Sequence, residues 1–366
     1  MQKNVTQFGK VVKFQPLLLE IWEDPIEVIL HNSHYKHTGV TSTVSDLLPI
    51  LEKSMVIAST GAKLSKQGKS IPLWKPLFIS RKKPRIWHAR RNNEMLLGII
   101  FKFIFFCNIK LIFTTSKQKP YSLFSRFLIS KMDKIIATSK SSQLFLSVPS
   151  EVISHGVDVE VFKPEKNKDS LRKDLNLPSD FLVGCFGRIR PLKGTDIFVD
   201  SAIQLLKKTK NCTFIIVGQA TPQFKNFKER QVQKIRSAHL EEKILFFDEI
   251  NNSEISKWYQ SMDLFIAPGR YEGFGLTIIE AMAAGIPTVA FKNVGTYSEQ
   301  ILDNETGYLV SQISSKKLTE KLEDIIKNKR ALKKMGQKAR SHTQTNFNIN
   351  IEAPALTRIY QDLLTK

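Results

Sequence analysis

The alternation of strand and helix patterns constrains the fold of this chain more than any other feature. Short apolar runs recur through most of its length, and helical or loop segments separate them. The strand-like runs are IEVILHN, SMVIAST, PRIWHAR, IKLIFTT and DKIIATS in the first half and FLVGCFG, TFIIVGQ, KILFFDE, DLFIAPG and PTVAFKN in the second. Strands that alternate with helices form parallel sheets covered on both faces. The pattern predicts an α/β fold of two doubly wound, Rossmann-like domains that face a central cleft.

The division between the domains is predicted from a loss of periodicity. A chain of 366 residues is long enough for two domains, at roughly 100 to 200 residues each. Residues 151–170 begin as a strand and then run through Gly156, Pro164 and a charged stretch. We expect an N-terminal domain over residues 1–163, a C-terminal domain over 164–345 and a final helix over 346–366. That helix either caps its own domain or crosses back to the first.

The charge of the chain points to an acidic partner. The formal net charge is +21, and Glu94 and Asp133 are the only carboxylates between Lys53 and Ser150. Nucleic acid, an anionic membrane and a phosphorylated small molecule all fit such a charge. No helix-turn-helix pattern and no basic motif interleaved with aromatic residues is present, so we expect no nucleic-acid partner.

One apolar stretch raises the question of a membrane. Residues 95–113 read MLLGIIFKFIFFCNIKLIF, but Lys102 and Lys110 interrupt the run, and a spanning helix needs about 20 largely uncharged residues. Either a helix at Asn92 to Phe106 precedes a buried strand, or that helix rests on a bilayer surface. The N-terminus lacks a signal core and the three cysteines form no motif. We therefore expect a cytoplasmic protein, peripheral on the inner face of the cytoplasmic membrane.

The stretch EGFGLTIIE carries the strongest functional pattern. Gly273, Phe274 and Gly275 lead into a helix that begins near Leu276 and Thr277. Free N–H groups and the positive end of the helix dipole make the start of this helix a phosphate-binding site.

Two glutamates flank this predicted phosphate-binding site. Glu280 lies one turn beyond Thr277, where its carboxylate can accept hydrogen bonds from a ribose diol, and Glu272 precedes the helix, nearer the far end of a ligand. They are therefore not expected to flank one bond. The alternative interpretation is a solvated Glu280 with glycines that only form a turn.

Three further segments carry candidate residues. In GCFGRIRPLKG, a strand end delivers Arg188 and the following turn carries Lys193, so the two cations can clamp a diphosphate. Gly39 and Val40 lie between a strand and a helix, where their N–H groups can approach the same diphosphate, although an ordinary turn explains them equally well. His88 ends PRIWHAR at the edge where such sheets bind ligands.

Together these motifs resemble glycosyltransferase family 4, whose members are retaining enzymes of the GT-B fold. The carriers are E-x7-E at Glu272 and Glu280, GFG at 273–275, GRIRPLKG at 187–194 and SHGVDVEVFKP at 154–164. Within the family, GVTSTV and IWHARRNNEM are most similar to bacterial lipopolysaccharide core mannosyltransferases.

The resemblance implies a role for each candidate residue. Glu280 binds the donor ribose and Glu272 the hydroxyls of the transferred sugar. Arg188 and Lys193 stabilise the leaving diphosphate with help from the amides of Leu276 and Thr277, and His88 approaches the sugar from the first domain.

The expected reaction is the transfer of mannose from GDP-mannose to a lipid-linked saccharide such as lipopolysaccharide core, with retention and without a metal cofactor. No D-x-D motif or cluster of His, Cys and Asp with ligand spacing is present. Two alternatives stay open: a glucosyl- or galactosyltransferase of cell-envelope polysaccharide synthesis that uses a UDP-sugar, and a non-catalytic protein that binds sugar nucleotides.

Overall fold

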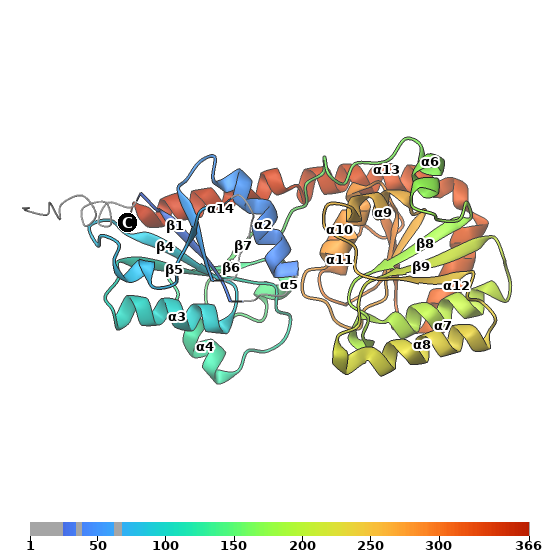
Figure 1. Cartoon of the computed structure of the whole chain (residues 1–366), viewed down its shortest axis with the longest axis horizontal. Helices are drawn as coiled ribbons and strands as arrows, with labels where there is room; N and C mark the ends of the chain where they lie inside the picture. Colours follow the sequence, from blue (N-terminus) through green and yellow to red (C-terminus); the bar gives the residue numbers. More distant parts are fainter. Residues whose placement is uncertain (1–24, 34–38, 62–67, 366) are drawn as a thin grey trace, which may run out of the picture.

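The structure is a computed structural model that describes residues 25–33, 39–61 and 68–365. The segment that was inspected for a signal core lies outside the described residues. Two parallel β-sheets stand side by side, each with helices on both faces (Figure 1). The predicted class of fold is confirmed.

The first sheet has the strand order β3-β2-β1-β4-β5-β6-β7, and all its neighbouring strands are parallel. Its chain order reverses between β1 and β4. The strands are β1 (Val28–Asn32), β2 (Ile57–Gly61), β3 (Ser70–Ile71), β4 (Arg85–Ala89), β5 (Ile109–Thr115), β6 (Lys134–Ala137) and β7 (Glu151–Val152).

The second sheet repeats this topology with the order β10-β9-β8-β11-β12-β13. Its order reverses between β8 and β11, the kind of switch point at which doubly wound sheets bind ligands. The strands are β8 (Phe181–Phe186), β9 (Cys212–Val217), β10 (Ile244–Phe247), β11 (Leu264–Ala267), β12 (Thr288–Phe291) and β13 (Gly307–Val310).

Helices cover both sheets, as the alternation of patterns requires. Those of the first half are α2 (Gly39–Leu51), η1 (Lys75–Leu77), α3 (Asn92–Phe103), α4 (Leu123–Ile129) and α5 (Lys140–Gln143). Those that follow are α6 (Lys168–Asp174), η2 (Pro191–Lys193), α7 (Thr195–Leu206), η3 (Pro222–Phe224), α8 (Lys225–Ser237), α9 (Ile255–Ser261), α10 (Leu276–Ala283), α11 (Tyr297–Gln300), α12 (Ser315–Lys327), α13 (Lys329–Asn346) and α14 (Ile349–Leu364).

The last helix packs on the first sheet. In Figure 1, α13 runs along the second sheet and α14 continues to the first, where it lies beside α2. Leu356, Ile359 and Tyr360 of α14 are buried in one core with Leu30 of β1 and Leu47 of α2. The end of the chain therefore completes the core on one face of the first sheet.

Glycine makes the crossing between the domains possible. The Val157 amide donates to the Phe347 carbonyl at 2.9 Å, and the Ile349 amide donates to the Val157 carbonyl at 3.0 Å. A Cβ on Gly156 would lie 2.4 Å from the backbone nitrogen of Ile349. The linker and the junction of α13 with α14 thus touch backbone to backbone, which a larger residue would prevent.

The helix α3 ends three residues before the predicted Phe106. Its end is closed by a 3.2 Å bond from the Phe105 amide to the Ile100 carbonyl and a 2.9 Å bond from the Cys107 amide to the Phe101 carbonyl. Phe106 is left-handed, with φ of 52°, as expected for a residue just beyond a helix closed in this way. Ile104 and Phe106 are consequently exposed at the end of α3. None of the helices in the described parts of the chain is long and apolar enough to cross a bilayer.

Candidate active site

A pocket lies at the carboxyl ends of β8 and β11, at the switch point of the second sheet. Its walls include Arg188, Lys193, Glu272, Thr277 and Tyr297. The structure therefore brings together four of the predicted site residues, which come from two motifs about 80 residues apart, and adds a tyrosine.

Lys193 and Glu272 form an ion pair across this pocket. Their side chains are 27% and 17% exposed, so water screens the pair only in part. The other carboxylate oxygen of Glu272 accepts a hydrogen bond of 3.2 Å from the Gly273 amide. Burial, reinforced by the neighbouring Glu272 carboxylate, raises the pKa of Tyr297 well above its usual value, so this phenol stays protonated. The Glu272 carboxylate is thus held between the Lys193 ammonium and the Tyr297 phenol.

The glycine loop, residues 271–275, fixes the start of α10. Gly275 is left-handed, with φ of +84°, and a Cβ there would lie 2.9 Å from the ring of Tyr297. The Phe274 carbonyl accepts one hydrogen bond from the Thr296 hydroxyl and one of 2.8 Å from the Gln300 amide. This anchoring leaves the N-terminus of α10 beside the pocket, where its amides and dipole favour an anion.

Glu280 lies one turn into α10 and receives a hydrogen bond of 2.6 Å from the Tyr259 hydroxyl. Burial raises its pKa to about 7; the Tyr259 bond opposes this shift, and the Asp46 carboxylate of the first domain adds to it. Glu280 therefore changes charge close to neutral pH.

Arg188 follows β8 after one residue, Gly187, and lines the pocket with an exposed side chain. Lys193 ends η2, and the turn that carries it closes at Gly194, with φ of 72°. A Cβ on Gly194 would lie 1.9 Å from the Pro268 carbonyl oxygen. The turn can therefore pack against the loop that leads to Glu272 only with glycine at this position.

The first domain contacts the glycine loop directly. The Gln118 side-chain amide donates to the Gly273 carbonyl at 3.0 Å, and the Lys119 ammonium lies 4.2 Å from the centroid of the Tyr271 ring. Nearby, Glu299 accepts bonds from the Lys140 amide at 3.0 Å and the Ser141 amide at 2.8 Å. These contacts place the loop between the domains.

His88 lies in β4, inside the core of the first domain. Its ring is fully buried, and its two nitrogens hydrogen-bond to the hydroxyls of Tyr360 and Thr114, each at 2.7 Å. Burial lowers the pKa of His88 well below its usual value, so the ring is neutral. Tyr360 of the crossing helix stands against the ring, and the approach of His88 to a sugar stays a prediction.

Gly39 and Val40 form the first residues of α2, the helix that they were predicted to precede. Their amides belong to the first turn of the helix, whose N–H groups have no partner within the helix.

Sequence reasoning missed Tyr259, Tyr297, Thr296, Gln300 and Gln118. Each contacts a motif residue from a distant segment, and no local pattern marks it. Among the described residues, no group of three or more His, Cys, Asp or Glu side chains could hold a metal ion.

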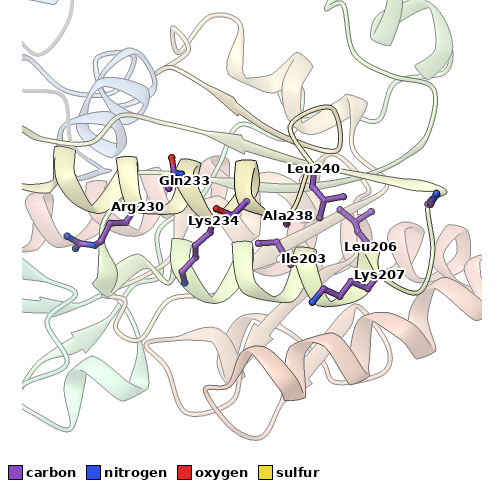
Figure 2. Close-up of a pocket in the computed structure, with 10 residues that line it drawn as sticks. Ile203, Leu206, Lys207, Arg230, Gln233, Lys234, Ala238 and Leu240 are labelled. Carbon is purple, nitrogen blue, oxygen red and sulfur yellow. The ribbon is translucent and has the colours of Figure 1, made fainter.

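A second, larger pocket of about 800 Å³ lies between α7 and α8 (Figure 2). Its floor is apolar, with Ile203, Leu206 and Leu240, and its rim carries lysine and arginine side chains such as Lys207 and Arg230. It contains none of the predicted site residues.

Comparison with known proteins agrees with the fold and the motifs. The profile of the family "Glycosyl transferases group 1" matches residues 167–342. The lipopolysaccharide core biosynthesis mannosyltransferase LpcC of Rhizobium leguminosarum bv. viciae is 37% identical over 93% of this chain and 97% of its own length. This chain belongs to the group 1 glycosyltransferases and is an enzyme of that class.

Two solved structures are similar to parts or most of the chain. The C-terminal domain of a group 1 glycosyltransferase, LpcC from Francisella tularensis, is 37% identical, with a TM-score of 0.51 over 53% of this chain and 100% of that domain. Anabaena HepE, solved with UDP and glucose, is 18% identical, with a TM-score of 0.81 over 92% of this chain and 100% of its own. The HepE likeness concerns the fold alone, which is the predicted GT-B arrangement.

Proposed function

We propose that this enzyme transfers mannose from GDP-mannose to a lipopolysaccharide core saccharide with retention of configuration. The names of its full-length relatives support the mannose and the core acceptor. The arrangement of Lys193, Glu272 and the start of α10 around one pocket is the observation that carries the proposal.

In this proposal the second domain holds the nucleotide sugar. Glu280 accepts hydrogen bonds from the ribose diol, and Glu272 accepts them from hydroxyls of the mannose. Arg188, Lys193 and the amides of Leu276 and Thr277 stabilise charge on the departing diphosphate, a form of electrostatic catalysis that needs no metal. The reaction then proceeds by attack on the same face from which the diphosphate leaves.

The first domain has supporting roles. The amides of Gly39 and Val40 at the start of α2 approach the diphosphate or the sugar. His88 acts through Tyr360 and Thr114. It holds the crossing helix, α14, against β4 and β5, and so fixes the position of these elements in the first domain.

Transfer assays with a panel of sugar nucleotides test the proposal. Purified enzyme is incubated with core glycolipid and GDP-mannose, UDP-glucose or UDP-galactose, and the product is analysed by mass spectrometry and NMR. We expect mannose in α linkage from GDP-mannose. Transfer from a UDP-sugar alone would favour the alternative donor, and an absence of transfer with every donor would contradict the proposal.

We also propose that the first domain docks on the anionic inner face of the cytoplasmic membrane. Leu123, Phe124 and Phe127 of α4 are 79%, 54% and 55% exposed, and Phe103 and Phe106 at the end of α3 are 52% and 73% exposed. The helices α3 and α4 pack against each other. Apolar side chains beside lysines are the composition that binds an interface rich in anionic lipids. A lipid-linked acceptor would be met at that surface.

A further inference from the structure

A loop of the first domain reaches the glycine loop of the second domain at the edge of the site. It follows β5, and its residue Gln118 donates a side-chain hydrogen bond of 3.0 Å to the Gly273 carbonyl. The backbone amide of Gln118 also donates to the Tyr271 hydroxyl, at 3.4 Å. A Cβ on Gly273 would lie 3.0 Å from the hydroxyl oxygen of Ser116. The two loops therefore pack closely at this point.

Contacts within the first domain hold this loop in place. The Lys117 amide donates to the Thr115 hydroxyl at 3.2 Å, and the hydroxyls of Thr115 and Tyr121 are hydrogen-bonded at 2.6 Å. The Lys117 ammonium lies 4.5 Å from the centroid of the Tyr121 ring. Gln118 therefore projects from a backbone that is anchored on both sides, and its half-buried side chain meets the second domain in a defined direction.

The peptide that Gln118 holds lies next to Glu272. The Gly273 amide donates to the Glu272 carboxylate at 3.2 Å, and the carbonyl of the same glycine accepts the bond from Gln118. The carbonyl of the next residue, Phe274, is instead held from within the second domain. The orientation of Gly273, and with it the amide that Glu272 uses, thus depends on a bond from the other domain.

We propose that Gln118 is a positioning residue for sugar transfer, which acts through Gly273 to fix the Glu272 carboxylate. This inference rests on the proposed function, because it requires the transferred sugar to bind at Glu272. The side chains assigned to the ribose and the diphosphate all belong to the second domain: Glu280, Arg188 and Lys193. Nucleotide binding should therefore not need Gln118, whereas turnover should need the two domains in contact.

The test compares Gln118→Met with the wild type in transfer from GDP-mannose to core glycolipid. Methionine keeps the length of the side chain but cannot donate, so kcat should fall about five- to tenfold, as for the loss of one hydrogen bond. The Kd for GDP, measured by calorimetry, should stay within about twofold of the wild type. Gln118→Lys retains an N–H donor and should restore kcat to about half of the wild-type value or more. Gln223→Met on the exposed part of η3 is the matched control and should change neither value.

A double-mutant cycle shows whether Gln118 acts through Glu272. In the Glu272→Gln background, Gln118→Met should change kcat by less than about twofold, because the carboxylate that it positions is already lost. An equal fall in kcat in both backgrounds would make the inference wrong. A Kd for GDP that rises by the same factor as kcat falls would also contradict it, since the contact would then shape the whole second-domain site.

The outcomes separate this inference from the proposed function. Transfer of mannose by the wild type, with an equal kcat for Gln118→Met, would contradict the inference and leave the proposed function standing. If the wild type transfers only from a UDP-sugar, the same cycle with that donor and with UDP tests Gln118 in the same way. An absence of transfer with every sugar nucleotide would overturn both.

Discussion

Tyr259 of α9 donates a hydrogen bond of 2.6 Å to Glu280 of α10, and the two side chains share a buried environment. The phenol is the neutral partner, because burial, followed by the Glu280 charge, raises the pKa of Tyr259 well above its usual value. The carboxyl group, with its pKa raised to about 7, is the member of the pair that titrates.

Binding of the sugar donor should therefore depend on pH through Glu280. An ionised carboxylate accepts both ribose hydrogen bonds more strongly than a protonated one. We expect the KM for the sugar nucleotide to rise by up to tenfold per pH unit as the pH falls below about 7. Tyr259→Phe should move the midpoint upward, because the tyrosine bond lowers the pKa of Glu280. A KM profile of Glu280→Gln that still bends near pH 7 would assign the titration to another group.

The same group should make stability fall as the pH rises. The pKa of Glu280 is raised from the usual value of about 4.3 to about 7 on folding, so the folded state favours the protonated form. Its contribution to stability is complete below about pH 4 and is lost as the pH passes through 7. Thermal unfolding should show Glu280→Gln with a higher Tm than the wild type at about pH 8 and a smaller difference at about pH 5. An equal difference at both pH values would contradict this linkage.

Lys193 and Glu272 should behave as a coupled pair. Each single variant, Lys193→Met or Glu272→Gln, leaves a partly buried charge without its partner. We expect each to lower kcat about 100-fold or more, as for the loss of a group that stabilises the transition state. The Tm of the double variant should exceed the value expected from adding the two single effects. Strict additivity of the Tm changes would mean that the ion pair contributes nothing to the stability of the fold.

Glu299 should act on turnover from across the domain boundary. Its carboxylate accepts bonds from the Lys140 and Ser141 amides, and its helix α11 is preceded by Thr296, which holds the glycine loop. Glu299→Gln is expected to lower kcat/KM about tenfold by weakening this charge-assisted contact. Small-angle scattering should show a larger radius of gyration for the variant. Glu320→Gln on α12 is the control. Equal kinetics for the two variants would show that the Glu299 contact between the domains does not affect turnover.

The aromatic face of the first domain should decide membrane binding. A triple variant of α4, Leu123→Ser, Phe124→Ser and Phe127→Ser, removes apolar area that is already exposed, so the fold should survive. We expect flotation with anionic liposomes at low salt to fall about tenfold or more. Ile313→Ser, which removes an exposed apolar residue of the second domain, should have no effect. Unchanged flotation of the triple variant would place the contact elsewhere.

The fold was predictable because it follows from local patterns. Every apolar run read as a strand contributes a strand to one of the sheets, and the runs are buried because both faces of a parallel sheet are covered. The short β13 was missed. Its four residues, GYLV, are only half-buried and do not continue an apolar run that precedes them. The boundary at residues 163 and 164 stays a prediction.

The candidate site was predictable only where one motif contained it. Glycines, a helix start and two glutamates within nine residues are readable as a phosphate-binding site, and the pairing of β8 with β11 in the second sheet explains why Arg188 and Lys193 join them. The burial of His88 was not readable, because the hydroxyl that covers it belongs to Tyr360, at the other end of the chain.

The crossing of α14 has a consequence for synthesis on the ribosome. Domains generally fold as units while the chain emerges, the N-terminal one first. Here one face of the first sheet is covered by Leu356, Ile359 and Tyr360, which are translated after the whole second domain. The first domain therefore has to wait, with that face covered only in part by α2, until the ribosome has nearly finished. The nascent chain is most exposed to aggregation during this interval, and chaperone demand should track the time between translation of β1 and of α14.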